Sequence, residues 1–73
     1  MIEHTLDCTD LRCPMPIVRI SQTIKSMAAG ERLRVDATDP AFRADIEAWT
    51  RRLGHLLVDF HDGKIQQAVI EKR

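Results

Sequence analysis

The sequence lacks a net charge, a long apolar run and a dense set of cysteines. Among its 73 residues, eleven Lys and Arg balance eleven Asp and Glu, so it has no broad basic field of the kind that nucleic-acid binders use. No segment approaches the roughly 18 apolar residues of a membrane span, and the first residues carry no basic stretch followed by an apolar run. We therefore expect a cytoplasmic protein with no membrane and no direct nucleic-acid partner.

The two cysteines are too few for a disulfide scaffold. The spacing of Cys8 and Cys13 matches neither a C-x-x-C redox pair nor half of a familiar zinc site. A metal held by both cysteines and one of His4, His55 or His61 is an alternative, but no second ligand pair has the usual spacing. We expect two free thiols and no metal.

The length allows one domain, which we expect to span residues 1–73. A domain of this size buries only about 60% of the surface that its unfolded chain exposes, so there is no room for a deep pocket. No internal repeat, low-complexity tract or linker interrupts it. Function is therefore expected to lie on the surface.

The first half of the chain predicts a strand, a helix and a second strand. Apolar and polar residues alternate over residues 2–8, with Cys8 on the apolar side. Apolar positions recur at helical spacing from Pro16 to Ala29, and Gly30 is the expected helix end. Alternation returns over residues 32–37.

The second half predicts a helix and a hairpin. Thr38-Asp39-Pro40 combines capping side chains with a proline suited to a helix start, and the helix should end at Gly54. Its apolar stripe consists of Phe42, Ile46, Trp49 and Leu53. Leu56, Val58 and Phe60 should form one face of a third strand, and Asp62-Gly63 should join it to a fourth strand, Ile65 to Ile70. The order βαβαββ predicts an α/β (α+β) two-layer sandwich, with both helices on one face of a mixed four-stranded sheet.

Two prolines give Cys13 a special position. A residue before proline is disfavoured in helical geometry, so Cys13 should lie extended just before a helix that starts at Met15 or Pro16. Pro14 and Pro16 fix this geometry at little cost, because the first helical amides have no intrahelical partner. The positive helix end, those free amides and the neighbouring Arg12 are expected to lower the thiol pKa and favour a nucleophilic thiolate.

A thiolate of this kind can take the outer sulfur from a protein-bound persulfide and later pass it to another thiol. That reaction needs no deep pocket and no adjacent base. A hydrolase-type Cys-His pair is the alternative, but it needs an imidazole close to Cys13 and a substrate pocket for which the chain has little volume.

Leu6-Asp7, Leu11 and Cys13-Pro14-Met15-Pro16 together resemble the signature of the TusA/SirA/YedF-like sulfur-carrier family. Further similar segments are Gly30-Glu31, Thr38-Asp39-Pro40-Ala41, Asp45-Ile46, Trp49, Gly54-His55 and Ile70-Glu71-Lys72. The resemblance implies a fold like the C-terminal domain of bacterial translation initiation factor three. It also implies a transient persulfide on Cys13 with no other cofactor, in a sulfurtransferase-type carrier rather than a multiple-turnover enzyme.

The resemblance further implies two kinds of partner. A donor such as a cysteine desulfurase supplies the sulfur, and an acceptor protein receives it on a route to tRNA thiolation, molybdenum-cofactor maturation or sulfur oxidation, while some branches are tied to selenium. The candidates for partner docking are Arg12, Met15 and Arg19, beside or just after the cysteine. On its polar side the first helix carries only Arg19 and Lys25 as basic residues, fewer than we associate with the tRNA-thiolation branch.

Asp10 is a departure from the family pattern, which usually has glycine before Leu11. Its charge is expected to raise the thiol pKa, against the effect of the helix and of Arg12. Cys8 is expected to be a core residue, and a second reactive thiol is the alternative. Two rival functions follow: a redox switch between Cys8 and Cys13, or a regulatory or RNA-binding module without sulfur chemistry.

Overall fold

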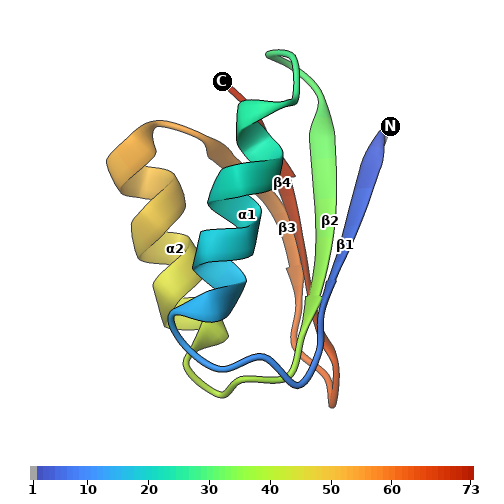
Figure 1. Cartoon of the computed structure of the whole chain (residues 1–73), viewed down its shortest axis with the longest axis vertical. Helices are drawn as coiled ribbons and strands as arrows, with labels where there is room; N and C mark the ends of the chain where they lie inside the picture. Colours follow the sequence, from blue (N-terminus) through green and yellow to red (C-terminus); the bar gives the residue numbers. More distant parts are fainter. Residues whose placement is uncertain (1) are drawn as a thin grey trace.

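The computed structural model, which describes residues 2–73, has the predicted order βαβαββ (Figure 1). The elements are β1 (His4–Cys8), α1 (Met15–Lys25), β2 (Arg32–Ala37), α2 (Phe42–Leu53), β3 (Leu56–His61) and β4 (Gln66–Glu71). Met1, which the predicted domain of residues 1–73 includes, lies outside the described residues, and that domain extent stays a prediction. No helix within residues 2–73 is long and apolar enough to cross a membrane.

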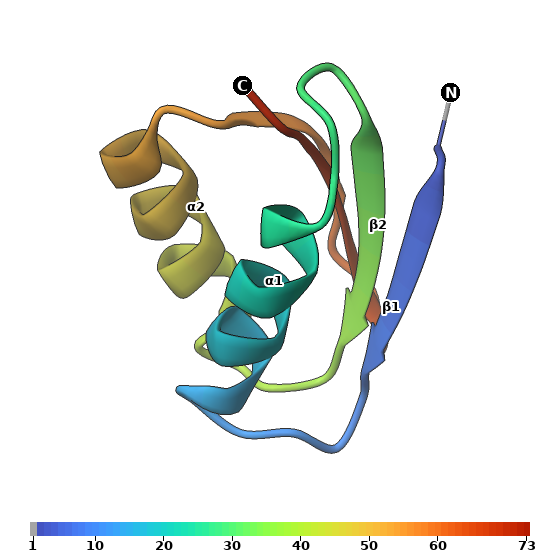
Figure 2. The ribbon, with the colours of Figure 1, turned by 45° about the horizontal axis from the view of Figure 1, so that its top comes forward.

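The four strands form one mixed sheet in the order β1-β2-β4-β3. Strands β1 and β2 are parallel, and β4 runs antiparallel to both β2 and β3. Both helices lie on the same face of this sheet, as Figures 1 and 2 show from two directions. The predicted two-layer fold is therefore confirmed. The hairpin between β3 and β4 places the last strand inside the sheet and β3 at its edge.

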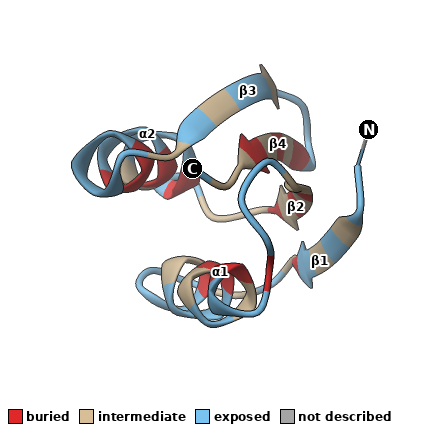
Figure 3. Ribbon diagram, turned by 90° about the horizontal axis from the view of Figure 1, so that it is seen from above, coloured by how far each residue is buried: buried red, intermediate tan, exposed pale blue. Residues whose placement is uncertain are grey.

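The core lies between the helices and the sheet (Figure 3). The predicted alternation in β2 is confirmed, because Leu33, Val35 and Ala37 are fully buried. Side chains buried to within a few per cent of full burial come from both layers: Cys8, Ile20, Ile24, Met27, Phe42, Ile46, Trp49, Ala68 and Ile70. Burial of these apolar surfaces against one another is the main force that holds the two layers together.

Helix α1 ends at Lys25, four residues before the predicted end at Ala29. The backbone N–H of Ser26 donates to the carbonyl of Thr23 at 3.1 Å, and the Ser26 hydroxyl donates to the same carbonyl at 2.8 Å. Hydrogen bonds between residues three apart, instead of the four of an α-helix, tighten the last turn and end the helix. The predicted role of Gly30 as the helix end is wrong: at φ 91° it lies in the following turn.

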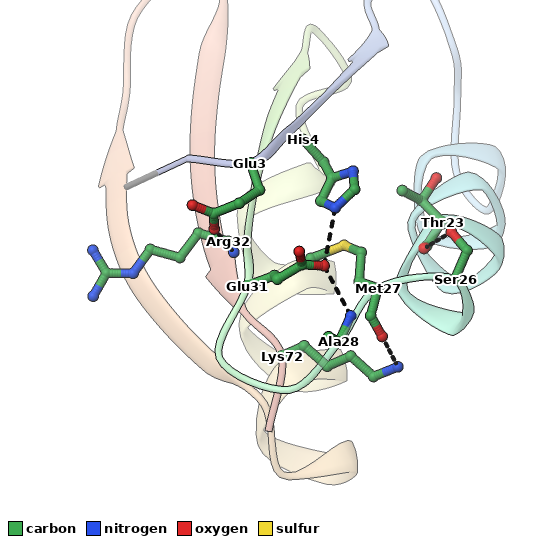
Figure 4. Close-up of polar contacts among 9 residues, drawn as sticks. All are labelled: Glu3, His4, Thr23, Ser26, Met27, Ala28, Glu31, Arg32 and Lys72. Atoms are coloured by element: carbon green, nitrogen blue, oxygen red, sulfur yellow. Dashed lines mark hydrogen bonds and ion pairs between the residues drawn. The ribbon is translucent and has the colours of Figure 1, made fainter.

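A polar cluster fixes that turn against the start of the sheet (Figure 4). One Glu31 carboxylate oxygen accepts from the Ala28 N–H at 2.8 Å and contacts the His4 Nε2 at 3.1 Å. These hydrogen bonds, the first from Ala28, lower the pKa of Glu31. The Lys72 ammonium donates to the carbonyl of Met27. The chain between α1 and β2 is thereby tied to the first strand and to the residue that follows the last one.

Two predictions about apolar faces in the second half are wrong. Leu53 is 51% exposed because it closes the last turn of α2, just before Gly54 at φ 77°. In β3, Leu56 and Val58 are exposed while Leu57 and Phe60 pack against the core. Leu57 pairs with Ile70, and Asp59 pairs with the next residue, Val69, so Val58 forms a β-bulge. One extra residue reverses which side chains face inward.

Candidate functional site

Two loops leave the sheet at the carboxyl ends of β1 and β2, and they carry the candidate site. Cys8 at the end of β1 pairs with Ala37 at the end of β2, so the chain segments that follow both strands begin side by side. The first loop leads to Cys13 and α1, and the second, residues 38–41, leads to α2. Carboxyl ends of adjacent parallel strands are a common place for binding sites in such folds.

Asp10 holds the first loop in a sharp turn. Its φ of 65° lies in the left-handed region, which glycine adopts most readily and Asp adopts occasionally. The Leu11 N–H donates to the carbonyl of Cys8 at 3.2 Å, and the Asp10 N–H donates to the Thr38 hydroxyl at 2.9 Å. The turn is therefore present here with Asp in the strained position.

Asp39 ties the two loops together, a role that the sequence interpretation missed. One carboxylate oxygen accepts from the backbone N–H of Cys13 at 2.7 Å, and the other accepts from the N–H of Ala41 at 3.2 Å. The predicted cap is therefore wrong in its position: α2 begins at Phe42 with Ala41 as the N-cap residue, and no side chain caps it. Instead, Asp39 shapes the turn before the helix and fixes the backbone at Cys13.

Cys13 lies exposed just before α1, as the prolines predict. Helix α1 starts at Met15 with Pro14 as its N-cap residue, and Pro16 is buried in the first turn. Few free amides are present there: Pro14 has no N–H, the Met15 N–H donates to the Arg12 carbonyl at 2.8 Å, and the Val18 N–H already makes the first intrahelical bond, to the Pro14 carbonyl at 3.1 Å. Pro16 has no N–H to offer.

A shallow groove of about 250 Å³ runs between α1 and α2 beside the cysteine. Its lining consists of Cys13, Pro14, Ile17, Asp45, Ala48, Trp49 and Arg52. The Asp45 carboxylate is the main cause that raises the pKa of the Cys13 thiol, and burial and the negative charge of Asp39 add to it. The groove thus combines a thiol with a carboxylate that stabilises its protonated form.

The expected lowering of the Cys13 pKa is therefore wrong. Arg12 was expected to favour the thiolate and Asp10 to oppose it, but the groups that act on the thiol are Asp45 and Asp39. Both come from the second loop and its helix, 26 or more residues along the chain, so a local argument could not include them. A spacing signal was present, because Asp45, Ala48, Trp49 and Arg52 recur at helical intervals on one side of α2.

Cys8 is fully buried in the core, in agreement with the structural role expected for it. Burial is the main cause that raises the pKa of its thiol. A redox switch between Cys8 and Cys13 would have to expose a residue on which the core packs. Both cysteines are free thiols in this structure.

The three candidate docking residues, Arg12, Met15 and Arg19, are all exposed. Met15 is 43% exposed, and Val18, one turn further along α1, is 38% exposed and extends this apolar surface. Arg12 also lines a second, polar hollow of about 660 Å³ between the two loops, together with Asp10, Thr38, Asp39 and Pro40. Cationic and apolar side chains are therefore exposed in the loop before Cys13 and on α1 after it.

His4 and His55 make contacts away from Cys13, and His61 does not line the groove beside it. His4 pairs with Glu31 at the far end of β1, as Figure 4 shows. His55 packs against Trp49 after α2, with 5.4 Å between ring centroids, and accepts from the Arg73 N–H. Within residues 2–73, no histidine lines the groove, and no group of three or more His, Cys, Asp or Glu side chains is arranged to hold a metal ion.

Comparison with known proteins gives a consistent set of similarities. A family model described as sulfurtransferase TusA matches residues 4–72. The chain is 42% identical over 64 residues to the "Putative sulfur carrier protein" of Aquifex aeolicus (strain VF5), covering 85% of this chain and 32% of that protein. It is 48% identical over 50 residues to the "Putative sulfur carrier protein YrkF" of Bacillus subtilis (strain 168), covering 68% of this chain and 27% of that protein.

A third relative has a similar length to this chain. The "Putative sulfur carrier protein NMA0882" of Neisseria meningitidis serogroup A is 44% identical over 59 residues, covering 81% of this chain and 80% of that protein. The chain thus spans about a third or less of the first two relatives and most of the third. The solved SirA-like protein of Desulfitobacterium hafniense shares the fold, with a TM-score of 0.79 and 18% identity over 93% of this chain and 95% of that one.

Proposed function

Since this chain belongs to the TusA sulfurtransferase family, we propose that it carries sulfur as a transient persulfide on Cys13. The observation that carries this proposal is the contrast between the two thiols. Cys13 is exposed beside a groove at the start of α1, whereas Cys8 is buried in the core. Of the two, only Cys13 is reachable by a reactive group on another protein without opening the fold.

The chemistry is an exchange of sulfur between thiols, without an external oxidant or reductant. The Cys13 thiolate attacks the outer sulfur of a persulfide, R–S–SH, on the donor. A new S–S bond forms at Cys13, the S–S bond of the donor breaks, and the donor leaves as R–S⁻, which takes up a proton. In the second half, the thiolate of an acceptor attacks the outer sulfur of the Cys13 persulfide, and the Cys13 thiolate is the leaving group.

The shape of the site suits a carrier that meets large partners. The groove beside Cys13 is shallow, so it holds no small substrate away from water, and the reacting groups must come from other proteins. A cysteine desulfurase is the proposed donor, and a sulfur-accepting protein on one of the three expected routes is the proposed acceptor. Arg12, Met15 and Arg19 are the proposed contact residues around the sulfur.

The test is to incubate the chain with a cysteine desulfurase and cysteine, and to locate added sulfur by mass spectrometry of the intact protein and its peptides. One added sulfur on Cys13 is expected. Cys8→Ala is the matched control and should keep the adduct, while Cys13→Ser should lose it. An adduct of the same yield in Cys13→Ser, or no adduct from a panel of persulfide donors, would contradict the proposal.

A further inference from the structure

The carboxylate of Asp45 comes from α2 and lines the groove beside the candidate sulfur site. Asp45 lies in the first turn of α2, where its N–H donates to the carbonyl of Ala41 at 3.0 Å. Its side chain is half-buried and lines the same groove as the Cys13 thiol, together with Pro14 and with Ile17 of α1. The packing of the two helices therefore holds the carboxylate next to the sulfur.

The charges around this groove are only partly compensated. Within residues 2–73, neither Asp45 nor Asp39 forms an ion pair, although five arginine–carboxylate pairs occur elsewhere. Arg52 lines the groove, and Arg12 lies in the loop before Cys13, but neither is paired with the two carboxylates. Of these four charged groups, the two carboxylates are the ones that act on the thiol.

We infer that Asp45 is a positioning residue that holds Cys13 as a protonated thiol, and that a partner frees the thiolate by placing a cationic side chain in the groove. The inference rests on the proposed function and names the partner chemistry it requires: a Lys or Arg beside the donor's reactive sulfur. The unpaired Asp45 carboxylate would attract a positively charged side chain that enters the groove, because the two charges are opposite.

The proton can be followed through the step. In the resting chain, the Asp45 carboxylate lines the same groove as the Cys13 thiol, and its negative charge disfavours loss of the thiol proton. When a cation pairs with the carboxylate, the negative charge near the sulfur is compensated. The thiol then gives its proton to water, and the thiolate attacks as described above. The resting carrier is thus less reactive toward adventitious electrophiles than it is in a complex.

The first test compares the pH dependence of Cys13 alkylation by iodoacetamide in the unmodified chain, in Asp45→Asn and in Asp62→Asn. Asp62 is an exposed hairpin residue and serves as the control. At neutral pH, Asp45→Asn should react about fivefold faster, the effect of removing one contacting unit charge in water. At high pH the rates should converge, because the thiol is then ionised in all three proteins. Superimposable pH profiles would overturn the inference.

The second test needs no variant and so does not depend on how well Asp45→Asn folds. Three small disulfides of similar size, cystamine, hydroxyethyl disulfide and dithiodipropionate, carry positive, zero and negative charge. Exchange with Cys13 should be fastest for the cationic reagent and slowest for the anionic one, by at least about fivefold between the extremes, and added salt should reduce the difference. Equal rates, or the reverse order, would refute the cation requirement.

Neither test uses a sulfur donor, so their outcomes are separate from that of the persulfide experiment. A chain that accepts sulfur on Cys13 but shows no charge preference keeps the proposed function and loses this inference. A chain with a strong charge preference that accepts sulfur from no donor keeps the role of Asp45 and loses the proposed function.

Discussion

Replacing Asp39 with Asn should lower the stability of the protein and weaken the link between the two loops, although the two side chains have nearly the same shape. The two carboxylate oxygens of Asp39 each accept a backbone N–H, from Cys13 at 2.7 Å and from Ala41 at 3.2 Å. Asn offers one carbonyl oxygen and one NH₂ group, so one of the two N–H donors must face another donor. The variant therefore loses at least one hydrogen bond to an ionised acceptor, whatever the orientation of the amide.

The expected cost is about 1–2 kcal/mol, because the lost bond involves a charged acceptor but lies near solvent. A chain of this length has a total stability of order 4–11 kcal/mol, so the loss is measurable. With a urea dependence of about 1 kcal/mol/M, the midpoint should fall by about 1–2 M. Asp62→Asn, in the exposed hairpin, should change stability by no more than about 0.5 kcal/mol and is the control.

The assay combines urea unfolding, followed by far-ultraviolet circular dichroism, with amide hydrogen exchange at Cys13 and Ala41. Exchange should become roughly tenfold faster than in the unmodified chain at whichever of these two amides faces the new NH₂ group, since that amide loses its acceptor. A midpoint shift equal to that of Asp62→Asn, together with unchanged protection of both amides, would refute the assignment of Asp39 as the link between the two loops.

Two further predictions concern the turn at Asp10 and the cluster at Glu31. Asp10→Gly should be about 1 kcal/mol more stable than Asp10→Ala in urea unfolding, because φ 65° suits glycine and strains alanine; equal midpoints would contradict this. The Ala28 N–H and His4 lower the pKa of Glu31 in the folded protein. The ionised carboxylate therefore stabilises the fold fully above the unfolded carboxyl pKa of about 4.3. This stabilisation is lost as the pH falls through the folded pKa. Glu31→Gln should therefore lower the urea midpoint at about pH 7 and have little effect at about pH 3; an equal loss at both would contradict this.

The sequence predicted most of the secondary structure because burial follows local periodicity. The alternation in β1 and β2 and the helical spacing in α1 are set by which residues can face the same side, and that property is local. The face of β3 was wrong because the bulge at Val58 depends on its pairing with β4. The position of β4 inside the sheet likewise depends on a long-range pairing that no local pattern encodes.

In the candidate site, too, the local features could be predicted from the sequence and the long-range ones could not. The position of Cys13 before a helix could be predicted, since the two prolines restrict the backbone on either side of it. Its protonation preference could not, because the nearest acidic residue along the chain, Asp10, turns out to shape a loop, while the acids that act on the thiol lie on the opposite loop and helix. A local estimate therefore gave the wrong sign.

Because the pKa of the Cys13 thiol is raised and not lowered, the site requires something different of its partners. A thiol activated by its own helix would react with any accessible persulfide, and specificity would have to come entirely from docking. A thiol held protonated by an unpaired carboxylate is instead most reactive in a complex that supplies positive charge at that point, so the same groups contribute to reactivity and to selection. In this arrangement, exposure of Cys13 to solvent and protection of its sulfur from unspecific reaction are compatible, because the protection is electrostatic and needs no lid.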